Sequence, residues 1–227
     1  MATSQTTPKT PFRQLKRQVL RLLTAPDQTE VLSTLCRLPA RQVVNPLFSL
    51  LFHAEALVRW RSVVAMGAVV DGLARRDIES ARVVMRRFVW NLNDESGGIG
   101  WGSPECMGEI MARNRCLAEE YACLLVSYVR LDMNHLEHPV LQRGVLWAVA
   151  RLGTVRPALL RDAVGHLRLY MMSDDPYLRG LAAWAARAIG DITVAGRLAE
   201  LSADHRKIEI FRDGEMLTVT VAGLVAA

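Results

Sequence analysis

The segment from Trp90 to Glu109 gathers the residues of this chain that are best suited to chemistry. It reads WNLNDESGGIGWGSPECMGE, and four of the fifteen glycines fall within residues 97–102. Indole rings and carboxylates so close in sequence could bind a basic peptide, a cation or a polar small molecule. The residues expected to make such contacts are Trp90, Asn93, Asp94, Glu95, Ser96, Gly97, Gly98, Trp101, Glu105 and Glu109.

Three interpretations of this segment stay open. It could be a compact connection between helices, in which glycines adopt positive φ and tryptophans cover the backbone. It could be a recognition site for a partner. It could also be an active site in which Glu95, Glu105 or Glu109 acts as an acid or base. We build the functional hypothesis on recognition, name no catalytic residue and expect a protein that is not an enzyme.

The glycines do not form a nucleotide-binding motif. No Lys-Ser or Lys-Thr pair follows them, no strand pattern precedes them, and the nearby carboxylates would repel a phosphate.

The four cysteines contain no CxxC pair and are expected to be buried free thiols. The nearest histidine cluster, His135 with Glu137 and His138, precedes Pro139 and is expected to be a solvated turn. We therefore expect neither a cofactor nor a metal site.

Charge is distributed unevenly along the chain, whose formal net charge is +5. Residues 1–93 carry 14 Lys and Arg against 6 Asp and Glu, whereas residues 94–137 carry 3 against 8. The basic part could contact nucleic-acid phosphates, although the acidic part would oppose DNA locally. The arginines that could make those contacts are Arg75, Arg76, Arg82, Arg86 and Arg87.

The elements that must position these residues are almost all helices. Residues 12–23 place apolar side chains at helical spacing, and similar runs recur to about residue 203. The helices are expected near 12–23, 28–37, 39–52, 55–74, 77–93, 103–130, 138–152, 155–172, 174–189 and 192–203. Alternating residues at 208–211 and 216–221, around Asp213-Gly214, predict one β-hairpin. No run is apolar and long enough to predict a membrane span.

Internal repetition indicates how these helices pack. Residues 139–153 align without a gap on residues 176–190, 37 positions later, and residues 56–70 give a looser third copy. Trp147 aligns with Trp184, and Arg59 aligns with Arg179. Helices that repeat in this way bury their apolar faces against the neighbouring repeats. The pattern predicts an all-α fold of stacked helical repeats.

The proline-started, alanine-rich helices resemble HEAT repeats, especially the short HEAT-like type seen in phycobilisome lyases. This resemblance covers about residues 39–203 and implies an α-solenoid. The segment from Trp90 to Glu105 also resembles the signature of an uncharacterised HEAT-repeat family of sulfate-reducing bacteria, which implies that the segment is that family's distinguishing feature. HEAT-like alkyl-purine DNA glycosylases are similar in architecture, although their catalytic motif is not matched here.

The resulting expectation has three parts along the chain. Residues 1–11 form a flexible arm, residues 12–205 form a HEAT-like α-solenoid, and residues 206–227 form a β-hairpin cap. We expect a cytoplasmic protein-binding or scaffold protein, with no membrane partner and with recognition centred on residues 90–109. The alternative is a DNA-binding or DNA-repair protein of the helical-repeat glycosylase type.

Overall fold

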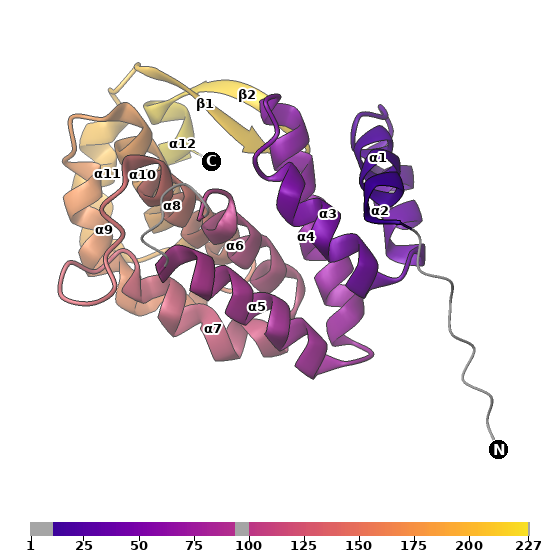
Figure 1. Cartoon of the computed structure of the whole chain (residues 1–227). Coiled ribbons are helices and arrows are strands. Elements are labelled where there is room, and N and C mark those ends of the chain that lie inside the picture. The colour runs from indigo at the N-terminus through magenta and orange to yellow at the C-terminus, as the bar shows by residue number, and fades with distance from the viewer. Residues whose placement is uncertain (1–10, 94–99, 227) are drawn as a thin grey trace.

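The structure is a computed structural model that describes residues 11–93 and 100–226 (Figure 1). Within these residues the chain forms twelve α-helices, two short 3-10 helices and one two-stranded antiparallel sheet. The helices are α1 (Phe12–Leu23), α2 (Gln28–Arg37), α3 (Ala40–Leu50), α4 (Ala56–Ala74), α5 (Ile78–Asn93), α6 (Ser103–Arg113), α7 (Arg115–Ser127), α8 (Pro139–Gly153), α9 (Val164–Met171), α10 (Pro176–Ile189), α11 (Ala195–Leu201) and α12 (Val221–Ala226), with 3-10 helices at Pro157–Ala163 and Ile192–Val194.

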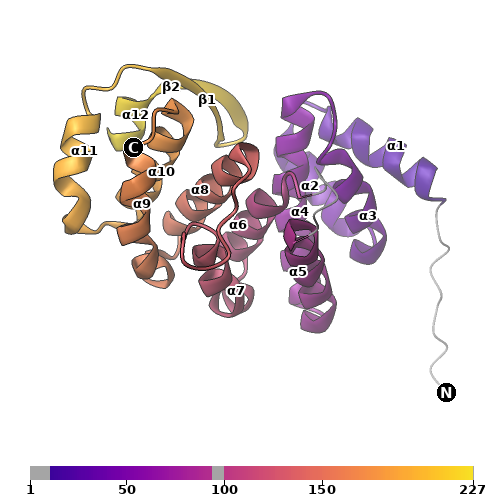
Figure 2. The ribbon, with the colours of Figure 1, turned by 60° about the vertical axis from the view of Figure 1, so that its left-hand side comes forward.

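The helices alternate between two rows, which confirms the predicted α-solenoid (Figure 2). The inner row contains α2, α4, α6, α8, α10 and α12, each in contact with the next. The outer row contains the odd-numbered helices, and side chains also join its members, such as the Phe48 and Phe88 rings at 4.5 Å between centroids. We call the side of the inner row that faces away from the outer row the inner face.

The repeat alignment corresponds to structurally equivalent helices. The three aligned segments lie in α4, α8 and α10 of the inner row. Arg59 donates from Nη1 to the carbonyl oxygen of His53 at 2.7 Å, and Arg179 donates from Nη1 to that of Ser173 at 2.5 Å. Each arginine thus binds the carbonyl six residues before it. The alignment of residues 56–70 with residues 176–190 therefore reflects a shared local structure as well as a shared sequence pattern.

The predicted single helix over 103–130 is wrong. Asn114 has extended backbone angles, φ −115° and ψ 115°, so α6 and α7 are separate helices. Its side-chain oxygen accepts a hydrogen bond from the backbone N–H of Leu117 and caps α7.

The expectation that all four cysteines are buried is also wrong, because Cys36, Cys116 and Cys123 are exposed and Cys106 alone is buried.

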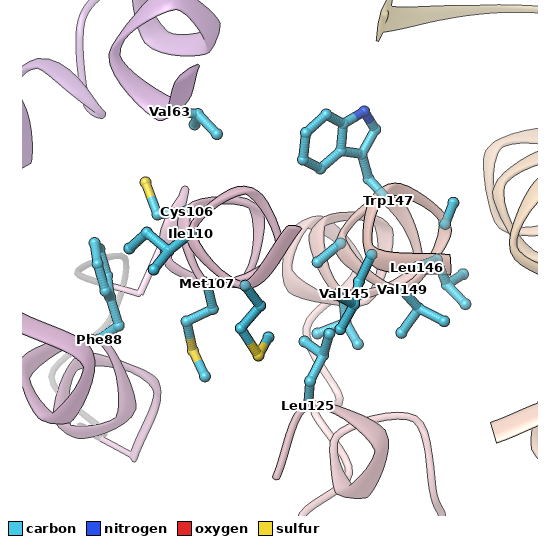
Figure 3. Close-up of a cluster of buried hydrophobic side chains, with 14 of the residues drawn as sticks. Val63, Phe88, Cys106, Met107, Ile110, Leu125, Val145, Leu146, Trp147 and Val149 are labelled. Atoms are coloured by element: carbon cyan, nitrogen blue, oxygen red, sulfur yellow. The ribbon is translucent and has the colours of Figure 1, made fainter. Parts of the chain in front are cut away.

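The core runs along the length of the solenoid between the two rows. Figure 3 shows side chains of α5, α6 and α8, among them Phe88, Met107, Ile110 and Val145, all of which are fully buried. In the same view the indole of Trp147 projects from α8 on the side away from Leu125 of α7. Trp147 therefore points to the inner face rather than into the space between the rows.

The predicted hairpin is present as β1 (Lys207–Arg212) and β2 (Glu215–Thr220), with Ile208 paired to Val219. It crosses the inner face: the Trp147 indole donates from Nε1 to the Phe211 carbonyl at 2.8 Å, and Gln28 of α2 donates to the Gly214 carbonyl at 2.6 Å. Helix α12, which the sequence pattern did not predict, follows the hairpin and packs on α10. The C-terminal segment thus reaches from the last helices back to the first repeat.

None of the helices in the described ranges, 11–93 and 100–226, has the length and hydropathy of a membrane-spanning segment.

Candidate functional site: a cavity on the inner face

A cavity of about 500 Å³ lies between the inner row and the hairpin. Its volume falls in the range that is typical of small-molecule and side-chain binding sites. We call it the Glu105 cavity. Its walls come from α4, α6, α8, α10 and β1 and from the segments before α4 and α6: Leu51, Phe52, His53, Arg59, Trp60, Val63, Trp101, Gly102, Glu105, Val140, Arg143, Gly144, Trp147, Tyr177, Leu181, Glu209 and Ile210.

Glu105 is positioned by the way in which α6 begins. Gly102 precedes the helix with φ 78°, a conformation that L side chains rarely adopt, and Pro104 follows in the first turn. The carboxylate then lies directly against Gly144 of α8, where an added Cβ would fall 2.7 Å from Oε1. Gly144 therefore makes the room that the carboxylate occupies.

The carboxylate of Glu105 is the least compensated polar group of the cavity. As a residue Glu105 is partly exposed, but its Oε2 atom is buried and accepts no hydrogen bond from residues 11–93 or 100–226. Burial raises the pKa of Glu105 to about 7. A buried acceptor without a donor costs free energy, so a ligand that donates to Oε2 would recover part of that cost.

Aromatic residues line the same cavity as this carboxylate. The Trp60 and Trp147 rings lie 4.8 Å apart between centroids, and Trp60 stacks on Phe211 at 5.2 Å with an angle of 5°. Trp101 is 43% exposed and lies 6.1 Å from the His138 ring. Of these residues Trp60, Trp101 and Trp147 line the cavity, and aromatic faces there can stack on a ligand.

The two arginines of the cavity are already bound by other groups. Arg143 donates to Oδ2 of Asp175 at 2.8 Å, and its guanidinium lies 4.3 Å from the centroid of the Tyr177 ring. Arg59 donates to the carbonyl oxygens of His53 and Ala54. Both guanidinium groups therefore bind acceptors other than Oε2 of Glu105, which has no partner among the described residues.

The structure places the residues predicted as contacts in several different environments. Trp101 and Glu105 line the cavity. Glu109 is 2% exposed, and both of its oxygens accept from arginines, so it is not the exposed contact that we expected. Trp90 is 63% exposed and Asn93 is exposed, and neither residue lines the cavity. Asp94, Glu95, Ser96, Gly97 and Gly98 lie outside the described residues.

Several residues of the cavity were not predicted from the sequence. Trp60 and Trp147 belong to the aligned repeat segments but were not predicted as contacts, and Arg143 and Tyr177 were not singled out. Trp60 and Tyr177 lie near the start of inner-row helices, and Trp147 lies in the middle of one. A signal was present, because aromatic residues recur in the aligned repeats, but the side to which they point depends on the packing of the rows.

The two carboxylates of α6 do not lie together in this cavity. Glu109, the other carboxylate of α6, is held by Arg113 and Arg151 and does not line the Glu105 cavity. In the described part of the chain, no group of three or more His, Cys, Asp or Glu side chains could hold a metal ion.

The arginines considered for nucleic-acid binding make contacts within the chain. Arg82 pairs with Glu79 and Glu120, and Arg75 pairs with Asp71 at 2.8 Å. Arg87 donates to Asn45 and lies 3.8 Å from the centroid of the Phe48 ring. Arg76 and Arg86 are exposed. No feature of the described residues specifically favours DNA.

Comparison with known proteins supports no family assignment. No protein-family model matches the chain. An uncharacterised protein of Archaeoglobus fulgidus is 25% identical over 183 residues, which cover 80% of this chain and 92% of that protein.

Among solved structures, an engineered protein is similar with a TM-score of 0.49 and 18% identity, covering 84% of this chain and 89% of that one. A designed armadillo repeat protein in complex with the peptide (KR)4 has a TM-score of 0.48 and 17% identity, covering 82% and 91%.

Proposed function

We propose that this chain is a partner-binding helical-repeat protein whose Glu105 cavity receives a basic side chain of another protein. The observation that carries the proposal is the buried Oε2 of Glu105, which has no hydrogen-bond donor among the described residues and lies in a cavity that three tryptophans line. An ammonium or guanidinium group would supply both the missing donor and the compensating charge.

The walls of the cavity favour the same occupant. Cations are attracted to the faces of aromatic rings, and the attraction grows when the cation is desolvated. Trp60, Trp101 and Trp147 supply such faces around the carboxylate. The aliphatic stem of a lysine or arginine would pack on the apolar residues Val63 and Leu181 of the same cavity.

The charges around the cavity permit a cation to enter. Arg59 and Arg143 are the positive groups, whereas Glu105, Glu209 and the Asp175 partner of Arg143 are the negative ones. When Glu105 is ionised, negative charges exceed positive charges by one. Since an incoming cation would favour ionised Glu105, binding should strengthen as the pH rises through about 7, the pKa of that carboxyl.

The proposal also covers the type of repeat and the segment that binds the partner. The alternating rows and the repeat in α4, α8 and α10 support a HEAT-like protein, with residues 90–109 as the recognition segment. Asp94 and Glu95 stay proposed contacts on sequence grounds.

The free thiols of Cys36, Cys116 and Cys123 are exposed, which fits a cytoplasmic location because exposed thiols persist best in a reducing compartment.

Calorimetric titration of matched tripeptides would test the proposal. Acetyl-Ala-Arg-Ala-amide and acetyl-Ala-Lys-Ala-amide carry the basic group, and the citrulline peptide is a neutral isostere of the arginine peptide. We expect at least one basic peptide to bind about tenfold more tightly than the citrulline peptide at pH 8, since charge-assisted hydrogen bonds are worth about 1.5 kcal/mol or more.

The variant Glu105→Gln should abolish this preference. Glu119→Gln is the matched control, because that carboxylate is 50% exposed on the outer row. Equal binding of the citrulline peptide, or a preference that survives in Glu105→Gln, would contradict the proposal.

A further inference from the structure

We propose that a second cavity on the inner face binds an organic anion, a carboxylate or phosphate group carried on a flat apolar body. The cavity measures about 710 Å³ and lies beyond Trp147 and Phe211 from the Glu105 cavity. We call it the Arg151 cavity. It is lined by Gln28, Thr29, Leu32, Val64, Glu109, Arg113, Trp147, Arg151, Thr154, Trp184, Phe211, Arg212, Asp213 and Gly214.

Three guanidinium groups from three different elements converge on this cavity. They belong to Arg113 at the end of α6, Arg151 in α8 and Arg212 at the end of β1. Their side chains are 31%, 27% and 32% exposed, so each is partly withdrawn from water. Arginines held in this way present planar forks of donors, which match the oxygens of carboxylates and phosphates.

Glu109 orients two of these arginines by binding the Nε donor of each and leaving their terminal nitrogens available. Its Oε1 accepts from Nε of Arg113 and its Oε2 accepts from Nε of Arg151, each at 2.6 Å. Because the carboxylate is bound through the two Nε atoms, the terminal nitrogens of both arginines are left for another acceptor. Glu109 is 3% exposed at its side chain and acts as a fixed anchor beneath them.

The charge balance of the cavity favours an anion. The three arginines face two carboxylates, Glu109 and Asp213, which leaves one positive charge in excess. Asp213 neutralises little of the positive charge of Arg212, because its side chain is 87% exposed and its Oδ2 lies 3.5 Å from Nε of Arg212. That Nε atom is buried and has no hydrogen-bond partner in the part of the chain that the structure describes. An anionic ligand would supply the missing acceptor.

The remaining walls indicate what carries the anionic group. Trp147 and Trp184 lie 6.4 Å apart between centroids in an edge arrangement, and Phe211 borders the same space. Flat apolar groups stack on such rings. Gln28 and Gly214, joined by a 2.6 Å hydrogen bond, close the end of the cavity near the hairpin turn. A planar organic anion fits this combination better than a bare inorganic ion does.

Titration with three naphthalene probes at constant ionic strength would test the inference. The probes are 1-naphthoate, 1-naphthyl phosphate and the neutral 1-naphthylmethanol. We expect one or both anions to bind at least about tenfold more tightly than the alcohol. Comparison of the two anions distinguishes a carboxylate from a phosphate ligand.

Variants locate the binding within the molecule. Arg212→Gln should weaken binding of the anion about tenfold with little loss of folding, since Asp213, its ion-pair partner, is exposed. Arg151→Gln should weaken it similarly, while Arg187→Gln, at an exposed position of α10, should not. Glu105→Gln should leave anion binding unchanged, so this inference and the proposed cation site can fail separately. Equal binding of the alcohol, or unchanged anion binding in both Arg212→Gln and Arg151→Gln, would overturn the inference.

Discussion

Glu105 and Glu109 lie four residues apart on α6, yet their carboxylates meet opposite environments. Glu109 is enclosed by two arginines that use both of its oxygens, so its burial is compensated. Glu105 lies against Gly144 in a cavity that Trp60 and Trp147 also line, and its Oε2 receives no donor from the described residues. The difference arises because Arg113 and Arg151 lie next to Glu109, whereas the arginines near Glu105 are bound elsewhere. At this scale Glu109 has a structural role, and Glu105 is available to a ligand.

Replacement of Glu105 by glutamine should stabilise the protein above pH 7. Burial raises the pKa of Glu105 from 4.5 to about 7, so the folded state favours the protonated form. The stability that wild type has below pH 4.5 is therefore lost as the pH rises to 7. We expect Glu105→Gln to match wild type near pH 4 and to exceed it by about 1–3 kcal/mol at pH 8.

Urea unfolding at both pH values would measure this difference, with Glu119→Gln as the control. A Glu105→Gln protein that is less stable than wild type at pH 8 would show that the ionised carboxylate makes a stabilising contact.

At the scale of elements, α6 and α8 pack so closely that the contact sets the position of Glu105. Gly108 of α6 faces Ala148 of α8, and an added Cβ would lie 2.6 Å from the Cα of Ala148. Main-chain atoms cannot move aside as a flexible side chain can. The small residues of both helices are thus required by their packing, and the close approach brings the Glu105 carboxylate against Gly144 one turn away.

The variant Gly108→Ala should destabilise the protein by about 1–3 kcal/mol, because overpacking at this contact forces the helices apart. Alanine normally favours a helix over glycine by about 1 kcal/mol, so the sign of the effect is informative. Gly72→Ala is the matched control: it lies in α4, an added Cβ would have no described atom within 4 Å beyond its chain neighbours and the nearby backbone of its own helix, and it should be stabilising. Chemical unfolding measures both effects. A stabilising Gly108→Ala would contradict the close packing of α6 and α8.

The sequence predicted the elements better than it predicted the site. Proline starts and aligned alanines indicated α8 and α10 correctly, since helix-start and packing signals are local. The break at Asn114 was missed because its only local sign is a capping residue inside a continuous helical pattern. Helix α12 was missed because the residues of Val221–Ala226 also suit a strand.

The composition of the cavity could not be predicted. Trp101 and Glu105 come from the segment singled out in the sequence, whereas Trp60, Arg143, Tyr177 and Ile210 come from α4, α8, α10 and β1. These residues meet through the stacking of the inner row and the return of the hairpin, which are long-range features. The orientation of each aromatic side chain depends on the row to which its helix belongs, and a repeat pattern alone does not specify the row.

At the scale of the whole molecule, the hairpin changes how an α-solenoid presents its inner face. It runs back from the last helices toward α2 and α4 (Figures 1 and 2). Phe211 packs on Trp60, and its carbonyl accepts from Trp147, so one strand residue separates two cavities. One cavity has an uncompensated carboxylate and the other has excess guanidinium charge. A partner that carries both a basic and an acidic group would therefore find complementary sites side by side.

Proton release on binding tests the central claim, that an ionised Glu105 receives a cation, most directly. Calorimetry of the arginine tripeptide at pH 7 in buffers of different ionisation enthalpy reports the number of protons exchanged. With a pKa of about 7, about half of the Glu105 side chains are protonated in the free protein, so binding should release up to about half a proton. Glu105→Gln should release none. Binding without proton release, or equal release from Glu105→Gln, would contradict the account.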